Sequence, residues 1–90
     1  MSELHCIVTG LVQGVRYRSF LEDAATKLGL TGFVRNLPDG SVEVCAQGEL
    51  DILKEFIEFV HEGSLQAKVE GVDAQWRSSR VTYYDFSVLH

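Results

Sequence analysis

The spacing of hydrophobic positions along the chain predicts an alternation of strands and helices. The segment from Leu4 to Thr9 alternates between two faces, as a strand does, and it leads into a loop bounded by Gly10 and Gly14. Apolar side chains then recur at three- and four-residue spacing from Arg18 to Leu28, and Gly29 is placed to end that helix. The chain therefore begins with a strand and a helix that are joined by a glycine-containing loop.

A hairpin and a second helix are predicted next. Two strand-like segments, Gly32 to Asn36 and Ser41 to Gln47, flank the turn Leu37-Pro38-Asp39-Gly40, in which proline presets φ and glycine accepts a positive φ. Apolar residues at helical spacing between Leu53 and Val60, with charged residues on the other side, predict a helix that ends before Gly63.

Two further alternating segments, Ala67 to Trp76 and Val81 to Leu89, complete the predicted sheet, and a change of parity at Gly71-Val72 suggests a bulge. The order strand, helix, strand, strand, helix, strand is the split βαβ arrangement, in which both helices cover one face of an antiparallel sheet. We therefore expect an α+β protein, a ferredoxin-like α/β sandwich. A single domain over residues 1–90 is expected, because a chain of this length leaves little room for a second core.

Charge and hydropathy narrow the possible partners. Thirteen acidic and eight basic residues give a formal net charge of −5, and the chain has no basic run, so binding to a nucleic acid is not expected. No stretch approaches the ~20 apolar residues of a membrane-spanning helix, and Met1 to His5 lacks the basic start of a signal peptide. We expect a cytoplasmic protein with no nucleic-acid or membrane partner.

The cysteines and histidines do not form the pattern of a disulfide framework or a metal site. Cys6 and Cys45 lie far apart, and the alternation of their strands places them on opposite faces of one sheet, so both are expected to remain free thiols. His5, His61 and His90 stand singly, without the spacing of metal ligands. No metal and no other cofactor is predicted.

The loop between the first strand and the first helix is the strongest candidate for a binding site. In Gly10-Leu11-Val12-Gln13-Gly14-Val15-Arg16-Tyr17-Arg18 a glycine-containing turn precedes a helix, and such a turn can point successive backbone N–H groups at one anion. It is not a Walker A loop, because no Gly-Lys-Ser/Thr follows. On spacing alone, an anion site and a tight turn with two ordinary surface arginines are about equally supported.

Three separated segments resemble the acylphosphatase family. They are the loop just described, Leu28-Gly29-Leu30-Thr31-Gly32-Phe33-Val34-Arg35-Asn36, and Asp39-Gly40-Ser41-Val42-Glu43-Val44. The family's pattern is Gly-x-Val-Gln-Gly-Val-x-x-Arg, then Leu-Gly-Leu-x-Gly-aromatic-Val-x-Asn, then Asp-Gly-x-Val-Glu, and its order and spacing agree with this chain. Arg16 stands where many members carry glycine or phenylalanine, and Leu37 stands where some carry threonine.

The resemblance implies a ferredoxin-like sandwich that hydrolyses small acyl phosphates to a carboxylate and inorganic phosphate without a metal. It also implies roles for individual residues. Arg18 would bind the phosphoryl group, and Asn36 would position the attacking water. The implied phosphate-binding loop consists of Gln13, Gly14, Val15, Arg16, Tyr17 and Arg18.

The chemistry of the two side chains suits these roles. The planar guanidinium of Arg18 can donate to two phosphoryl oxygens at once and stays charged at any relevant pH. Asn36 cannot act as a strong base, but its amide oxygen can accept a hydrogen bond from a water and hold it in line with phosphorus. Because the leaving carboxylate is weakly basic and the transition state is loose, positioning and charge stabilisation are sufficient without a general acid.

Other functions remain open at this point. A non-catalytic phosphate- or anion-binding regulatory module would keep the loop but would not need Asn36. A carbamoyl-phosphate-handling domain, like the amino-terminal part of hydrogenase maturation proteins, carries a similar loop but belongs to much longer chains. An RNA-binding sandwich is disfavoured by the charge and by the missing aromatic strand signature. We expect a monomer whose partners are a small-molecule acyl phosphate and inorganic phosphate.

Turnover is expected to be independent of metal ions, because no His, Cys or carboxylate cluster accompanies the loop. The purified protein should hydrolyse a simple aromatic acyl phosphate at the same rate with and without a chelator. A loss of activity on chelation that magnesium or zinc restores would contradict this expectation.

Overall fold

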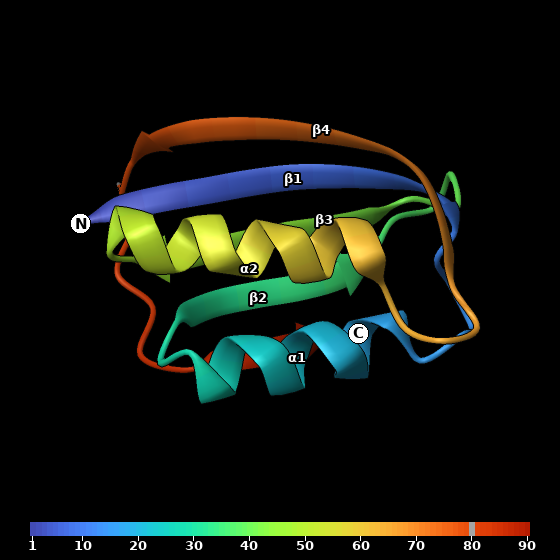
Figure 1. Ribbon diagram of the computed structural model, residues 1–90, viewed down its shortest axis with the longest axis horizontal. Coiled ribbons are helices and arrows are strands. Elements are labelled where there is room, and N and C mark those ends of the chain that lie inside the picture. Colours follow the sequence, from blue (N-terminus) through green and yellow to red (C-terminus); the bar gives the residue numbers. More distant parts are fainter. Residues whose placement is uncertain (80) are drawn as a thin grey trace.

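The computed structural model describes residues 1–79 and 81–90. Figure 1 shows two helices side by side on one face of a twisted sheet. No helix among the described residues has the length and hydropathy needed to cross a membrane. The predicted ferredoxin-like sandwich is confirmed, with the elements β1 (Ser2–Leu11), α1 (Tyr17–Lys27), β2 (Thr31–Asn36), β3 (Val42–Gly48), α2 (Leu50–Glu62), β4 (Lys68–Ser78) and β5 (Phe86–Leu89).

The sheet has the strand order β4-β1-β3-β2-β5 and is mixed. β1 is antiparallel to both β3 and β4, as the split βαβ arrangement predicts. β5 runs parallel to β2, with Gly32 opposite Phe86, so the prediction of a wholly antiparallel sheet is wrong. The reason lies in the path of the chain. After β4 the chain reverses direction and joins the other edge of the sheet, where β2 already runs in that direction.

The last strand is shorter than the predicted span from Val81 to Leu89, since only residues 86–89 pair with β2. Residues 81–85 instead pass towards the β2 edge and are bound by a side chain. The backbone N–H of Tyr83 donates to Oε1 of Gln47 at 3.2 Å, and Nε2 of Gln47 donates to the carbonyl of Val81. These backbone groups therefore have hydrogen-bond partners without belonging to the sheet.

A bulge interrupts the pairing of β4 with β1. The register shifts between Thr9 and Gly10, and Glu70 is left without a partner in β1, next to the predicted bulge at Gly71-Val72. A Cβ on Gly10 would lie 2.2 Å from the carbonyl oxygen of Lys68. This close approach requires glycine where β1 ends and the candidate binding loop begins.

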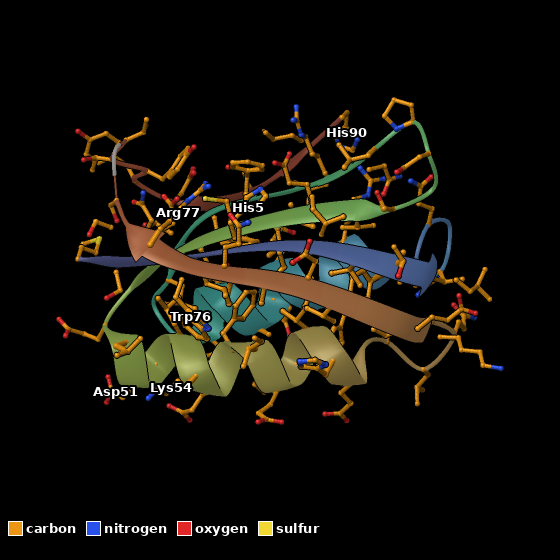
Figure 2. All side chains as sticks on the ribbon, turned by 90° about the horizontal axis from the view of Figure 1, so that it is seen from above. His5, Asp51, Lys54, Trp76, Arg77 and His90 are labelled. Atoms are coloured by element: carbon orange, nitrogen blue, oxygen red, sulfur yellow. The ribbon has the colours of Figure 1, made fainter. Side chains whose placement is uncertain are left out.

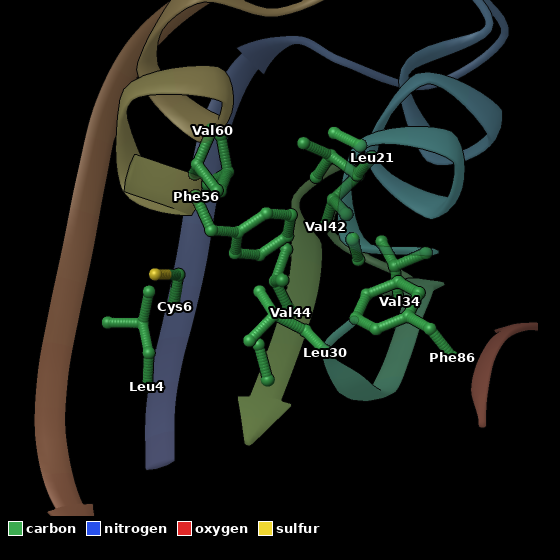
Figure 3. Packing of buried hydrophobic residues seen from close by; sticks show 14 of the residues in the cluster. Leu4, Cys6, Leu21, Leu30, Val34, Val42, Val44, Phe56, Val60 and Phe86 are labelled. Carbon is green, nitrogen blue, oxygen red and sulfur yellow. The ribbon is translucent and has the colours of Figure 1, made fainter. Parts of the chain in front are cut away.

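The core lies between the two helices and the sheet, as Figure 3 shows. The apolar stripe predicted for the second helix is buried at Leu53, Phe56 and Val60. The ring of Phe56 meets that of Phe86 edge to face, with 5.9 Å between the ring centroids. Because Phe86 begins β5, this contact fixes the final strand to the rest of the core.

The opposite face of the sheet carries charged and polar side chains. Figure 2 shows His5 and Arg77 on this face and Trp76 on the side of α2. Glu43 binds Nε2 of His5 at 2.7 Å and Nε of Arg35 at 2.5 Å. Partial burial acts to raise the pKa of Glu43, but the hydrogen bonds from His5 and Arg35 leave this pKa below its usual value. Arg35 is thus bound on the face that lies away from the helices.

The two cysteines are free and lie on opposite faces of the sheet, as predicted. Cys6 belongs to the core under the helices, whereas Cys45 pairs with His5 in the sheet and shares its face. Burial raises the pKa of each thiol to about 12. Both thiols are therefore protonated and unreactive at neutral pH.

Tyr17, the first residue of α1, packs into the core and joins the beginning of α1 to the end of α2. Its side chain is fully buried, and its phenol donates a hydrogen bond of 2.7 Å to the carbonyl of Val60. Val60 lies in the last turn of α2, where carbonyl groups have no partner within the helix. Burial also raises the pKa of the phenol above its usual value.

We expect Tyr17→Phe to lower the free energy of unfolding by about 1–3 kcal/mol, because a buried carbonyl would lose its hydrogen-bond donor. Urea unfolding measures this change. Tyr84→Phe is the matched control, since Tyr84 is 90% exposed and its replacement should change the free energy by less than about 0.5 kcal/mol. Equal values for the two variants would show that the buried hydrogen bond contributes nothing.

Candidate functional site

The turn between β1 and α1 presents backbone N–H groups that have no partner within the helix. Gly14 and Arg16 adopt left-handed φ values of +73° and +61°. The first helical hydrogen bond of α1 runs from the N–H of Phe20 to the carbonyl of Arg16 at 3.0 Å, so the N–H groups of residues 17–19 precede the helical ladder. Arg16 is the N-cap residue and its side chain caps nothing. The start of α1 is therefore suited to bind an anion.

A cavity of about 260 Å³ lies at this turn. Two arginines, Arg16 and Arg18, contribute to its lining, together with the start of α1 and the end of β5. It contains one histidine and no aspartate or glutamate, so positive charge dominates. The residues that line it are Val12, Gly14, Arg16, Tyr17, Arg18, Ser19, Val88 and His90.

The last strand orients Arg18. Nη1 of Arg18 donates a hydrogen bond of 3.2 Å to the carbonyl of Leu89. Leu89 pairs with Arg35 of β2, the residue before Asn36. The bond uses one N–H of the guanidinium and fixes the direction of its other donors. Arg18 is thus held next to the strand that carries Asn36.

Gln13 connects the turn to the β2–β3 hairpin. Its Nε2 donates to the carbonyls of Leu37 and Ser41, both at 2.8 Å. Asp39 fixes the same hairpin, because its Oδ1 accepts from the hydroxyl of Ser41 at 2.5 Å and from its N–H at 2.9 Å, which lowers the pKa of Asp39. Both N–H protons of the Gln13 side-chain amide bind the hairpin, so this side chain positions the turn. Only the backbone of Gln13 is left to bind an anion.

Asn36 ends β2, directly before the hairpin that Gln13 binds. Its Oδ1 is buried and accepts no hydrogen bond from any of the residues described. Asn36 does not line the 260 Å³ cavity itself. Two hydrogen bonds connect the neighbours of Asn36 to the turn. Gln13 donates to the carbonyl of Leu37, the next residue, and Arg18 donates to the carbonyl of Leu89, which pairs with Arg35. An unpaired buried acceptor therefore lies next to the turn that presents cationic groups and N–H donors.

The six predicted loop residues lie in one turn, but they have different roles there. The side chain of Tyr17 lies in the core, and that of Gln13 lies against the hairpin. The carbonyl of Val15 accepts a hydrogen bond of 2.7 Å from the hydroxyl of Ser64, which follows α2. These three residues hold the turn in place, whereas Arg16 and Arg18 are its cationic residues.

Sequence reasoning missed several residues at the site. Ser19 could have been found, because it stands in the first helical turn after the predicted loop. Val88 and His90 line the cavity from the end of the chain, and Leu89 holds Arg18 through its backbone carbonyl. A backbone acceptor has no signature in the sequence, so this last contact could not be predicted.

The described part of the chain offers no evident set of metal ligands. Over residues 1–79 and 81–90 no three His, Cys, Asp or Glu side chains lie together. The groups at the turn are guanidinium and backbone N–H donors, which bind anions and not cations. The expectation that turnover is independent of metals stays a prediction.

Comparison with known proteins agrees with this geometry. The acylphosphatase family model matches residues 4–88, which include the turn and the hairpin. The acylphosphatase of Marinobacter nauticus is 49% identical over 86 residues, which cover 96% of this chain and 94% of that protein. The crystal structure of acylphosphatase from Bacillus subtilis matches with a TM-score of 0.96 and 37% sequence identity. The match covers 100% of this chain and 100% of that chain.

A second solved structure, an acylphosphatase from Coxiella burnetii, has a TM-score of 0.91 and 39% identity, with 98% of this chain and 92% of that chain covered. The match of the family model over nearly the whole chain and the identity to full-length relatives agree. The chain belongs to the acylphosphatase family.

Proposed function

We propose that the turn at residues 13–18 and Arg18 hold the phosphoryl group of a small acyl phosphate, and that Asn36 orients the water that attacks it. The reaction is hydrolysis of the carboxyl–phosphate bond, which is the activity of the family to which this hydrolase belongs. The observation that carries the proposal is the link from Gln13 to the hairpin, which fixes the anion-binding turn against the strand that presents Asn36.

Several groups act together on the phosphoryl oxygens. The start of α1, whose first N–H groups have no helical partner, and Arg18 line the same cavity. Arg16 adds a second positive charge there. Because the phosphoryl transition state spreads charge over its oxygens, donors that are already aligned lower its energy without rearranging. The carbonyl of Leu89 supports this alignment by fixing Arg18.

Asn36 supplies the remaining requirement, the placement of the water. A water that donates a hydrogen bond to the amide oxygen of Asn36 would have its lone pair free to attack phosphorus. The new P–O bond forms as the bond to the carboxylate oxygen breaks with its electron pair. The proton of the water leaves with inorganic phosphate or passes to solvent. The leaving carboxylate needs no proton, so the absence of an acidic side chain from the cavity lining is no obstacle.

A non-catalytic anion-binding module would use the same turn without Asn36. No comparison favours that alternative, since the relatives described above are acylphosphatases. Action as a single domain over residues 1–90, as a monomer, in the cytoplasm and without a nucleic-acid partner remains our prediction from the sequence.

The proposed roles of Arg18 and Asn36 predict different losses. Arg18→Ala should weaken the binding of inorganic phosphate and lower turnover by roughly 10³-fold or more, because the charge it neutralises is present in ground and transition states. Asn36→Ala should leave phosphate affinity within about threefold while kcat falls by roughly 10²-fold, the scale on which misplaced reactants lose rate. Steady-state kinetics with benzoyl phosphate and inhibition by phosphate measure both quantities.

Arg35→Ala is the matched control for the loss of a positive charge, since Arg35 is bound to Glu43 on the other face of the sheet. It should leave phosphate affinity unchanged, and thermal melts should show that all three variants are folded. An Asn36→Ala protein with the parent's kcat would remove the proposed role of the asparagine. An Arg18→Ala protein with the parent's phosphate affinity would move the phosphate site elsewhere.

Gln13→Ala tests whether the turn must be held against the hairpin. The carbonyls of Leu37 and Ser41 keep hydrogen bonds from Gly40 and Leu37 within the hairpin, so the fold should survive. We expect kcat to fall by roughly 10-fold or more while phosphate affinity stays within about threefold, because the cradle remains but Asn36 loses its alignment. Gln13→Glu should behave similarly, since a carboxylate cannot donate to two carbonyls. A selective loss of phosphate affinity would instead make the Gln13 side chain a phosphate ligand.

A further inference from the structure

A second and larger cavity lies next to the proposed phosphate site. It is a groove of about 710 Å³ between the first turns of α1 and the segment that follows α2. Figure 1 shows the beginning of α1 and the end of α2 at the same end of the molecule. Its lining residues are Val15, Arg16, Ser19, Phe20, Asp23, Glu62, Gly63, Ser64, Leu65 and Gln66.

The groove adjoins the phosphate site. Arg16 and Ser19 line both cavities, so the two meet at the first turn of α1. The hydrogen bond from Ser64 to the carbonyl of Val15 fixes the wall of the groove to the turn itself. A molecule whose phosphoryl group is bound at the turn therefore has the groove as its nearest large space.

The direction of the reaction points to the same side. In an in-line displacement the water and the leaving oxygen lie on opposite sides of phosphorus. The anion-binding turn is attached at Gln13 to the hairpin that follows Asn36, and at Val15 to Ser64 beside the groove. A water at Asn36 thus places the leaving carboxylate away from the hairpin and towards the groove.

The surface of the groove suits an apolar group. Val15 and Phe20 are half-buried and pack against the core. Leu65 is fully exposed, so an apolar side chain stands at the groove without a partner in the protein. A Cβ on Gly63 would lie 3.3 Å from the side chains of both Ala67 and Val69, so the backbone beside Leu65 is closely packed. Burial of apolar surface here would contribute to substrate binding.

The charges of the groove are arranged along its length. Arg16 lies where it meets the phosphate site, whereas Asp23 and Glu62 border it away from that site. The carboxylate of Asp23 is paired with Nζ of Lys27 at 3.0 Å, so Glu62 is the acid that would repel a second carboxylate on the acyl group. This charge would disfavour anionic acyl groups relative to neutral ones.

We infer that this groove receives the acyl group of the substrate and that the enzyme prefers neutral, apolar acyl groups to those that carry a second carboxylate. The inference rests on the proposed function, because it assigns the part of the substrate that the phosphate site leaves outside. Leu65 contacts the acyl group, and Glu62 disfavours anionic acyl groups.

Three substrates test the inference: acetyl phosphate, benzoyl phosphate and 4-carboxybenzoyl phosphate. Leu65→Asp should lower kcat/KM for benzoyl phosphate by about fivefold or more, through lost apolar contact and an added charge, and should change kcat/KM for acetyl phosphate by less than about twofold. Leu65→Ser should lower kcat/KM for benzoyl phosphate in the same direction. Comparing variants on one substrate cancels differences in the intrinsic reactivity of the substrates.

Leu50→Asp is the matched control, because Leu50 is also exposed and stands at the start of α2, away from the groove. This variant should change kcat/KM by less than about twofold for each of the three substrates. Glu62→Lys should raise kcat/KM for 4-carboxybenzoyl phosphate relative to benzoyl phosphate by about threefold or more at low salt, and the gain should shrink as salt is added.

The outcomes distinguish a wrong assignment of the groove from a wrong proposed function. If the variants at Leu65 change kcat/KM equally for benzoyl phosphate and acetyl phosphate, or change it for neither, the acyl group lies elsewhere and the inference is overturned. The inference is also overturned if Glu62→Lys leaves the ratio of the two benzoyl substrates unchanged. Either result leaves the proposed function intact as long as the parent hydrolyses acetyl phosphate. Failure of the parent to hydrolyse any of the three substrates counts against the proposed function itself.

Discussion

The first turn of α1 is a helix start that no side chain of its own caps, and the rest of the site depends on it. The N–H groups of residues 17–19 have no helical acceptor, and the N-cap residue is an arginine in a left-handed conformation. Such an end is costly on its own, because both the missing cap and the φ of Arg16 disfavour it. Four contacts from four other elements hold it in place, and they are made by Gln13, Val15, Tyr17 and Arg18.

Each contact connects the turn to a different part of the fold. Gln13 binds the β2–β3 hairpin, the carbonyl of Val15 binds the segment after α2, Tyr17 binds the last turn of α2, and Arg18 binds β5. The sandwich therefore does more than bury a core. It brings the β2–β3 hairpin, the end of α2 and β5 to one end of the molecule, where they orient a short turn that would not keep this shape alone. Pre-organisation of this kind is what phosphoryl transfer requires, since the reaction depends on placement and on charge stabilisation.

Periodicity predicted the parts of the fold in which one face is buried. The stripe from Leu53 to Val60 and the alternation around Cys6 and Cys45 gave a correct helix and correct strand faces, because burial of one face imposes a period. Residues 81–85 alternate as well, but their backbone groups bind Gln47 and not a strand, so the pattern predicted a strand that is absent there. The partners of Gln13 and Arg18 lie 24 to 71 residues away and are backbone carbonyls, which no local pattern can reveal.

The overall charge of −5 would repel an anionic substrate, but the charges at the proposed phosphate site are arranged differently. Interactions between exposed charges are screened beyond about 8 Å at physiological ionic strength, so the cavity is governed by Arg16, Arg18 and the helix start. The same short range explains how one protein can attract a phosphoryl group and repel a carboxylate on the same substrate. Glu62 borders the neighbouring groove, where we propose that it acts on the acyl end, while the proposed role of the arginines is at the phosphoryl end. Recognition at the two ends is therefore set by local charge, and the net charge of the chain decides neither.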